Sequence, residues 1–191
     1  MDPSTGAVGA TDRECMARAI AAASEVRCTT SPNPWVGAVV RSEDGELFMG
    51  ATAEPGGPHA EVAALGAAGE SAVGSTLYVT LEPCSHHGRT PPCVEAIRAA
   101  GVVRVVIGVE DPDPLVSGAG IASLREAGIR VEVGAQSEHV RSQLVAYLTH
   151  RRTGRPFVVL KLAATLDGGT AAPNGTSQWI TSPEARADGH R

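Results

Sequence analysis

Short apolar runs alternate with Ala-rich segments of helical length along most of this chain, and that alternation limits the folds it can adopt. The apolar runs predict strands at residues 36–40, 46–50, 76–81, 103–109 and 130–133. The segments between them predict helices at residues 59–68, 93–100, 120–127 and 137–149, and a capping box at Thr11 and Glu14 predicts an earlier helix. This alternation predicts an α/β fold, in which helices cover both faces of a sheet. Because only 3% of the residues are aromatic, we expect a core of Ala, Val, Leu and Ile.

The charge and hydropathy of the chain exclude several classes of partner. The 191 residues carry a net charge of -5, which offers no basic surface for nucleic acid. No apolar segment reaches membrane-spanning length, and residues 1–10 lack the basic start and apolar centre of a signal peptide. We therefore expect a cytoplasmic protein with a small-molecule substrate and no nucleic-acid or membrane partner; homo-oligomerisation stays open. Four cysteines without an export signal favour metal binding over disulfides.

Two separated motifs carry the residue types that bind zinc. Pro58-His59-Ala60-Glu61 stands at a predicted helix start, and Glu82-Pro83-Cys84 follows a predicted strand, with Cys93 after eight intervening residues. One imidazole and two thiolates suit Zn²⁺, and three protein ligands leave the fourth tetrahedral position for water. The motifs therefore predict one zinc ion held by His59, Cys84 and Cys93. Bound zinc lowers the pKa of water towards neutrality, which makes a hydroxide nucleophile available.

Glu61 stands two residues after His59, where a general acid/base can reach the reacting water without binding the metal. Zinc-dependent base deaminases share the signature H-x-E followed by P-C-x-x-C, in which this glutamate carries the proton. The longer spacing from Cys84 to Cys93 departs from that signature and adds the donors Arg89 and Thr90 beside the metal. We predict a zinc-dependent deaminase with Glu61 as its catalytic residue.

Three other interpretations fit the same motifs. His86 or His87 as a fourth ligand would close the zinc site and make it structural. A non-catalytic, zinc-stabilised module would use the same ligands but would have no need for Glu61. A third alternative is another zinc nucleobase or nucleoside deaminase, acting on cytosine, guanine or an RNA base. A short Cys spacing would favour that alternative, and the low positive charge argues against RNA.

Several longer motifs together resemble one known family. They are the run from Thr80-Leu81-Glu82-Pro83-Cys84 to Thr90-Pro91-Pro92-Cys93, and Ser31-Pro32-Asn33-Pro34, Gly57-Pro58-His59-Ala60-Glu61 and Asp111-Pro112-Asp113-Pro114. The chain is similar in these motifs to the bifunctional riboflavin biosynthesis proteins of the RibD family. The resemblance implies a three-layer α/β/α sandwich of the cytidine-deaminase type. It also implies hydrolytic deamination of 2,5-diamino-6-ribosylamino-4(3H)-pyrimidinone 5′-phosphate to the 5-amino-6-ribosylamino-uracil phosphate.

The same resemblance implies which residues contact this substrate. Asn33 would hydrogen-bond the substrate, Arg89 and Thr90 would contact its ribosyl phosphate side, and Asp113 would line the pocket. A phosphate needs a cation and hydrogen-bond donors, which Arg89 can supply. Three positions depart from the common family pattern, namely Thr52 in place of a histidine, Asp113 in place of an asparagine, and Ala119 in place of a lysine or arginine.

Beyond Pro156 the chain resembles the start of the family's NADPH-dependent reductase domain. The matching motifs are Lys161-Leu162-Ala163-Ala164-Thr165-Leu166-Asp167-Gly168 and Ser177-Gln178-Trp179-Ile180-Thr181-Ser182. In the family, the positions of Ala163 and Trp179 contact the cofactor and that of Ser177 contacts substrate. We expect a strand at residues 157–162, a helix begun by Ser182-Pro183-Glu184, and NADPH binding only in a complete reductase domain. Reductase activity is expected to be absent from this chain.

These resemblances divide the chain into four segments. Residues 1–10 are expected to be a mobile N-terminus, residues 11–150 a zinc-dependent deaminase domain, and residues 151–156 a linker. Residues 157–191 are expected to be the truncated, incomplete start of a second α/β domain, the reductase.

Overall fold

The computed structural model describes residues 9–88 and 90–189. The chain divides into two compact units, Met1–Pro156 and Phe157–Arg191, which we describe separately. Most of the segment expected to be a mobile N-terminus, residues 1–8, lies outside the described residues. None of the described helices has both the length and the apolar composition that a membrane crossing requires.

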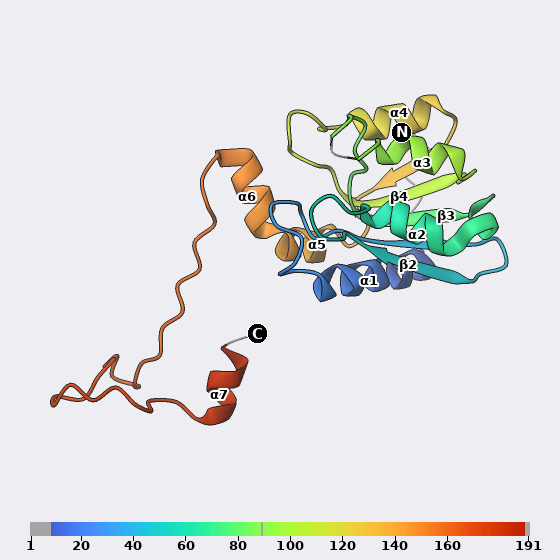
Figure 1. The fold of residues 1–191 in the computed structure, drawn as a ribbon. Coiled ribbons are helices and arrows are strands. Elements are labelled where there is room, and N and C mark those ends of the chain that lie inside the picture. The colour runs from blue at the N-terminus through green and yellow to red at the C-terminus, as the bar shows by residue number, and fades with distance from the viewer. Residues whose placement is uncertain (1–8, 89, 190–191) are drawn as a thin grey trace. The chain divides into compact units, whose positions relative to one another are not determined.

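The first unit is built on one five-stranded sheet (Figure 1). Its strands are β1 (Gly37–Arg41), β2 (Leu47–Ala51), β3 (Thr76–Leu81), β4 (Arg104–Val109) and β5 (Arg130–Val133), in the order β2-β1-β3-β4-β5. Strand β1 is antiparallel to β2 and β3, whereas β3, β4 and β5 run parallel to one another. Strands β1 and β2 form an antiparallel hairpin, and the parallel strands are joined through helices, as parallel pairing requires.

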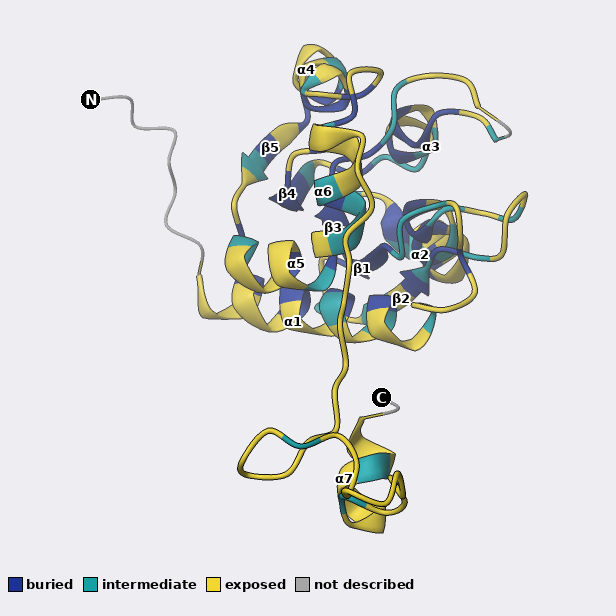
Figure 2. Ribbon diagram, turned by 90° about the vertical axis from the view of Figure 1, so that its left-hand side faces the viewer, coloured by how far each residue is buried: buried dark blue, intermediate teal, exposed yellow. Residues whose placement is uncertain are grey.

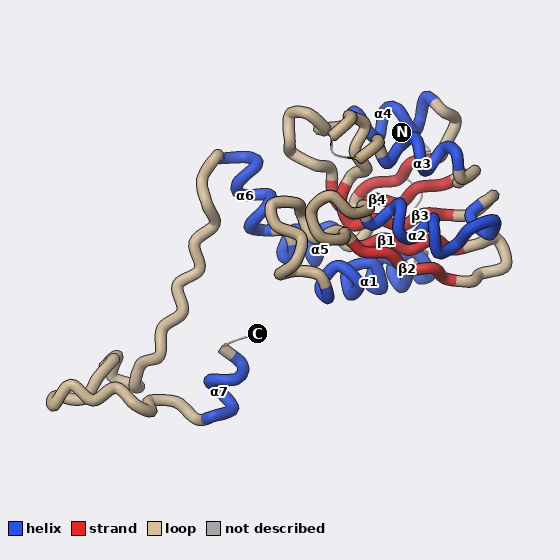
Figure 3. Tube along the Cα trace, viewed as in Figure 1, coloured by secondary structure: helices blue, strands red, loops and turns tan. Residues whose placement is uncertain are grey.

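Helices cover both faces of this sheet (Figure 3). One face carries α1 (Ala10–Glu25) and α5 (Ser137–Gln143), and the other carries α2 (Ala60–Ala68), α3 (Cys93–Ala99) and α4 (Ala119–Glu126). A 3₁₀ turn, Gly69–Ala72, follows α2, and α6 (Val145–Thr153) follows α5. The predicted three-layer α/β/α fold is confirmed.

The core lies between these layers and consists mainly of small aliphatic side chains. The central strands are buried on both faces, as the dark ribbon of β3 and β4 shows (Figure 2). Gly50 in β2 allows α2 to approach closely, because a Cβ there would lie 2.3 Å from the backbone nitrogen of Ala64. This close packing fixes the start of α2, where His59 and Glu61 are found.

Arg104 of β4 ties α1 to the far strand of the sheet. Its guanidinium donates to both carboxylate oxygens of Asp12 at 2.7 and 3.0 Å, and to both oxygens of Glu132 at 3.0 and 2.7 Å. The buried Tyr78 hydroxyl donates to Asp12 at 2.8 Å. Arg104 lowers the pKa of Asp12 well below its usual range, because the bidentate hydrogen bonds favour the carboxylate.

Two expectations about local structure in the first unit need correction. Helix α1 begins at Ala10, and its cap is made by Asp12, whose carboxylate accepts from the Gly9 N–H at 3.1 Å, so the predicted Thr11–Glu14 capping box was wrong. Asp12 occupies the third helical position, from which a carboxylate reaches back to the residue before the helix. Helix α6 runs to Thr153, so residues 151–153 of the expected linker are helical.

The second unit contains one helix, α7 (Pro183–Asp188), within the described residues. Ser182 caps it by accepting from the Ala185 N–H at 3.2 Å, as the Ser-Pro-Glu motif predicted. The strand predicted at residues 157–162 was wrong, since these residues have no regular secondary structure. A strand is stable only when it pairs with others and packs on a core. Leu160 of this segment is 78% exposed.

Candidate active site

The sheet topology gathers the candidate residues at one edge of the first unit. Strands β3 and β4 are parallel neighbours, so the segments after Leu81 and Val109 leave the sheet side by side. Strand β1 is antiparallel to β3 and therefore begins at this edge, three positions after Pro34. In open α/β sheets ligands bind beyond the carboxyl ends of the parallel strands.

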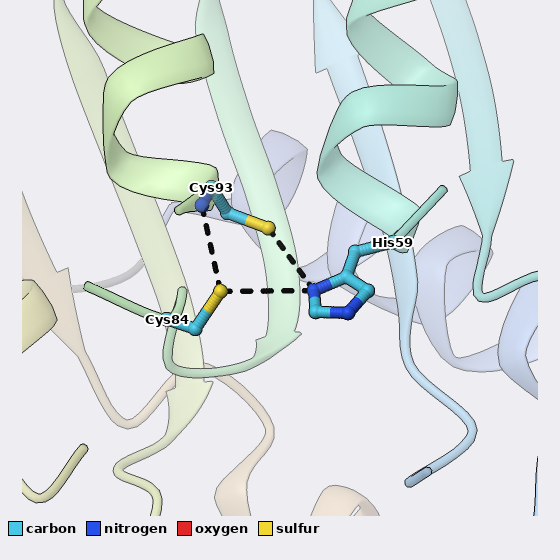
Figure 4. Close-up of side chains that lie close together, drawn as sticks. All are labelled: His59, Cys84 and Cys93. Atoms are coloured by element: carbon cyan, nitrogen blue, oxygen red, sulfur yellow. Dashed lines mark hydrogen bonds between the residues drawn. The ribbon is translucent and has the colours of Figure 1, made fainter. Parts of the chain in front are cut away.

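His59, Cys84 and Cys93 converge here from three segments (Figure 4). His59 occupies the position just before the first residue of α2, Cys84 follows β3, and Cys93 is the first residue of α3. The Nδ1 atom of His59 lies 3.7 Å from Cys84 Sγ and 3.3 Å from Cys93 Sγ. The Cys93 backbone N–H donates to Cys84 Sγ at 3.4 Å. The side chains of all three point to one small volume.

This donor set fits a zinc ion. The three ligand atoms lie within 4.8 Å of one another. A tetrahedral zinc with bonds of about 2.3 Å to sulfur and about 2.1 Å to nitrogen holds neighbouring ligand atoms roughly 3.5 Å apart, close to the separations found here. The other ring nitrogen of His59, Nε2, lies 3.5 Å from the Thr90 hydroxyl, and such an outer partner commonly orients a ligating imidazole.

Cys84 and Cys93 have opposite pKa shifts. The hydrogen bond from Cys93 and the adjacent His59 lower the pKa of Cys84 to about 4. The hydrogen bond to Cys84, together with burial, raises the pKa of Cys93. Since zinc binds thiolates, zinc binding would require Cys93 to lose its proton.

Glu61 lies in the first turn of α2, with only 4% of its surface exposed. Burial raises the pKa of its carboxyl. It lines a cavity of about 160 Å³ together with His59 and Cys84. The same cavity is therefore lined by two of the candidate metal ligands and by a carboxyl group that can accept or donate a proton.

Glu82 is a second buried carboxylate, and it organises the loop after β4. Its Oε2 accepts from the backbone N–H groups of Asp111 at 3.2 Å and Gly118 at 3.0 Å, and its Oε1 accepts from that of Ile121 at 3.2 Å. Gly120 permits this approach, because a Cβ there would lie 2.0 Å from the carbonyl oxygen of Pro83. Glu82 thus joins the Cys84 segment to the loop that carries Asp111.

The structure places three of the predicted substrate residues on the walls of this cavity or its neighbour. Asn33 and Asp113 line the cavity that contains Glu61, and Thr90 lines an adjoining cleft that also contains Asn33 and His59. Arg89 lies outside the described residues. Thr52 also lines the cavity, but its hydroxyl accepts from the Val36 N–H at 3.1 Å and so fixes the start of β1.

The remaining predicted residues belong to the second unit. Ala163, Ser177 and Trp179 are all exposed there, and the Arg186 guanidinium lies 4.1 Å from the centre of the Trp179 ring.

Neither histidine of the Cys84–Cys93 loop joins the metal cluster in the part of the chain that is described. His87 is exposed and lies 3.7 Å from Glu95 Oε1. His86 is exposed and lines the cavity that contains Glu61. The described structure therefore favours a three-ligand site with an open fourth position over the closed alternative.

Sequence reasoning missed three further residues of the cavity wall, Asp111, Tyr147 and Arg151. Asp111 could have been predicted, since it belongs to the Asp-Pro-Asp-Pro motif. Tyr147 and Arg151 lie on α6, far from every motif in sequence. The available signals were the i, i+4 spacing of an aromatic and a cationic residue and the rarity of tyrosine, of which the chain has two.

Comparison with known families divides the chain in the same region as the two units. A family model for the cytidine and deoxycytidylate deaminase zinc-binding region matches residues 10–109. A model for the RibD C-terminal domain matches residues 156–191.

Relatives of known sequence and structure carry the name RibD. The riboflavin biosynthesis protein RibD of Escherichia coli is 53% identical over 178 residues, which are 93% of this chain and 48% of that protein. RibD of Aquifex aeolicus is 49% identical over 179 residues, 94% of this chain and 50% of that protein. The solved structure of Acinetobacter baumannii RibD, form 1, has a TM-score of 0.86 and 47% identity, and covers 93% of this chain and 50% of that one. The chain spans about half the length of the curated relatives it matches.

Proposed function

The chain belongs to the cytidine and deoxycytidylate deaminase zinc-binding family, among its RibD members, and we propose that its first unit is a zinc-dependent aminohydrolase of riboflavin biosynthesis. The proposed reaction removes the 2-amino group of 2,5-diamino-6-ribosylamino-4(3H)-pyrimidinone 5′-phosphate as ammonia. The observation that carries the proposal is one cavity lined by His59, Cys84 and the buried Glu61, with the Cys93 thiol completing a cluster of three ligand atoms within 4.8 Å of one another.

The proposed role of each residue follows from the chemistry of its side chain. His59, Cys84 and Cys93 would hold the zinc ion. When bound, zinc acts as a Lewis acid that makes a hydroxide nucleophile available near neutral pH. Glu61 would take a proton from the attacking water on a carboxylate oxygen and deliver it to the nitrogen of the departing amine. Its burial keeps bulk water away from this transfer.

The acidic wall of the cavity suits a ring that carries several N–H groups. Asp111 and Asp113 offer carboxylate oxygens there, and Asn33 offers an amide that can both donate and accept. We propose that these residues bind the amino-substituted pyrimidine ring. Arg89 and Thr90 are proposed to contact the ribosyl phosphate side, with Arg89 supplying a charge-assisted hydrogen bond.

The deciding experiment measures ammonia release by the zinc-loaded chain. We expect turnover of the ribosylamino-pyrimidine phosphate and at most weak turnover of cytidine and guanine. Glu61→Gln should retain zinc and lose roughly 10²–10⁴-fold in kcat, as is typical when a general acid/base is removed. Glu54→Gln, a change of the same chemistry at an exposed residue, is the matched control. Near wild-type turnover by Glu61→Gln would assign the proton transfer to another group.

For the second unit we propose a role only within a complete reductase domain. The match of residues 156–191 to the RibD C-terminal domain supports assigning Ala163 and Trp179 to an NADPH site and Ser177 to a substrate site. The exposure of all three side chains is compatible with a site that needs further chain to form.

A further inference from the structure

Helix α6 forms one wall of the catalytic cavity, although it lies far from the metal motifs in sequence. Leu144 and Leu148, one helical turn apart, are buried and anchor this part of the chain to the core. Tyr147 and Arg151 are also one turn apart, and both line the cavity. The Arg151 guanidinium lies 5.3 Å from the centre of the Tyr147 ring, which restrains both side chains.

Tyr147 holds the carboxylate of Asp111. Its hydroxyl donates to Asp111 Oδ2 at 2.9 Å and lies 3.2 Å from Oδ1. Asp111 Oδ1 also accepts from the backbone N–H of Asp113 at 2.9 Å. One oxygen of Asp111 is therefore fixed by its own loop, and the other is fixed from α6.

Arg151 has the same relation to Asp113. Asp113 Oδ1 accepts from the backbone N–H of Leu115 at 3.0 Å, and its Oδ2 lies 3.2 Å from Arg151 Nη1. The two carboxylates of the loop after β4 thus share one arrangement, with a local amide on Oδ1 and a side chain of α6 on Oδ2.

A carboxylate that is fixed through one oxygen can still turn, because the torsion next to a planar group has a broad, shallow energy profile. A hydrogen bond to the second oxygen fixes the plane and therefore the direction of the remaining lone pairs. Ligand binding depends on that direction, since an acceptor that must be reoriented first binds less tightly. Arg151 also balances one of the negative charges that Glu61, Glu82, Asp111 and Asp113 bring to the cavity wall.

We propose that Tyr147 and Arg151 are positioning residues of the deaminase pocket, which hold Asp111 and Asp113 in the orientation that accepts hydrogen bonds from the substrate ring. This inference rests on the proposed function, because it assumes that the cavity binds the amino-substituted pyrimidine. It assigns to α6 a part in substrate affinity, whereas the chemical step belongs to Glu61 and the metal site.

A double-mutant cycle in steady-state ammonia release tests the proposal. Arg151→Met, which keeps the apolar stem, should raise KM about tenfold and leave kcat within about threefold, a size usual for contacting pairs. In an Asp113→Asn background the same change should alter KM less than about twofold, because the carboxylate it positions is gone. Tyr147→Phe removes a single oxygen and should raise KM about fivefold, again only while Asp111 is present.

Arg152→Met is the matched control, since Arg152 lies on the same helix but does not line the cavity, and it should leave KM unchanged. Zinc content and melting temperature are measured for every variant, so that a folding defect is recognised. An equal KM effect of Arg151→Met with and without the Asp113 carboxylate would overturn the inference, as would no KM effect of either Arg151→Met or Tyr147→Phe. A zinc-loaded wild-type chain that releases no ammonia would instead refute the proposed function, and the inference with it.

Discussion

Glu82→Gln tests whether one buried carboxylate organises the pocket loop. Glutamine has the same shape, but only one of its terminal atoms accepts hydrogen bonds. If the glutamine oxygen occupies the place of Oε2, it still accepts hydrogen bonds from the backbone N–H groups of Asp111 and Gly118. The glutamine NH₂ group then faces the backbone N–H of Ile121. The substitution therefore weakens two hydrogen bonds and replaces the third by two donors that face each other.

The expected cost follows from these three contacts. Hydrogen bonds to a charged group contribute roughly 1.5–3 kcal/mol and neutral ones roughly 0.5–1.5 kcal/mol, so each retained bond loses about 1 kcal/mol. An unsatisfied buried N–H costs a further 1–3 kcal/mol or so. Removal of a buried charge offsets part of this loss, and we expect the free energy of unfolding to fall by about 3 kcal/mol. For a chain of this size that lowers the melting temperature by roughly 6–12 °C.

The assay is thermal unfolding of the zinc-loaded variant beside Glu110→Gln. Glu110 is exposed on the same loop, so its substitution should change the free energy of unfolding by less than about 0.5 kcal/mol. Since the loop carries Asp111, we also expect KM for the substrate to rise in Glu82→Gln. A fall in melting temperature of less than about 2 °C, indistinguishable from the control, would refute the reasoning from buried hydrogen bonds.

Three further predictions address the metal, the substrate and the pH dependence of stability. Cys84→Ser or Cys93→Ser should lose zinc and deaminase activity together, because a hydroxyl is a far poorer zinc ligand than a thiolate; elemental analysis of the purified protein that found full occupancy would contradict this. Arg89→Ala should weaken binding of the phosphorylated substrate more than that of its dephosphorylated analogue, and equal losses in a binding titration would argue for a structural role. Arg104→Met should lower the free energy of unfolding by about 3 kcal/mol at neutral pH, because it leaves the nearly buried Asp12 carboxylate without its cation. Because the pKa of Asp12 is lowered in the folded state, this stabilisation is complete above its unfolded pKa of about 4 and is lost as the pH falls further. Urea unfolding should therefore show that the difference in free energy of unfolding between Arg104→Met and wild type becomes smaller below about pH 4. A difference that does not change with pH would refute the prediction.

The layered fold was predictable because its signals are local. Strands β3 and β5 have the predicted bounds, since β-branched runs bounded by turn residues leave little freedom in where a strand begins and ends. The start of α1 was misjudged by two residues because Thr11 and Asp12 are both good capping residues, and only the structure shows which side chain reaches the Gly9 amide. The strand at residues 157–162 was expected from composition, but pairing depends on partners that composition does not report.

The candidate site, too, was only partly predictable from the sequence. The grouping of His59, Cys84, Cys93 and Glu61 was expected from motifs whose residue types and spacing already imply a shared ligand. The contributions of Tyr147 and Arg151 were not predictable, because they depend on where α6 docks. That docking is decided by tertiary packing, and the i, i+4 spacing of the two residues does not report which part of the fold they face.

The position of α6 determines where the gene can be truncated without loss of the pocket. A fragment ending at residue 109, where the match to the deaminase family ends, would still encode His59, Glu61, Cys84 and Cys93. It would lack the loop after β4, β5 and the helix that completes the cavity wall, and its last strand would become an unprotected edge. The shortest piece that encodes the entire pocket extends to Thr153, the end of α6. Gene fusions, split-protein designs and expression libraries should therefore place their junction beyond that residue.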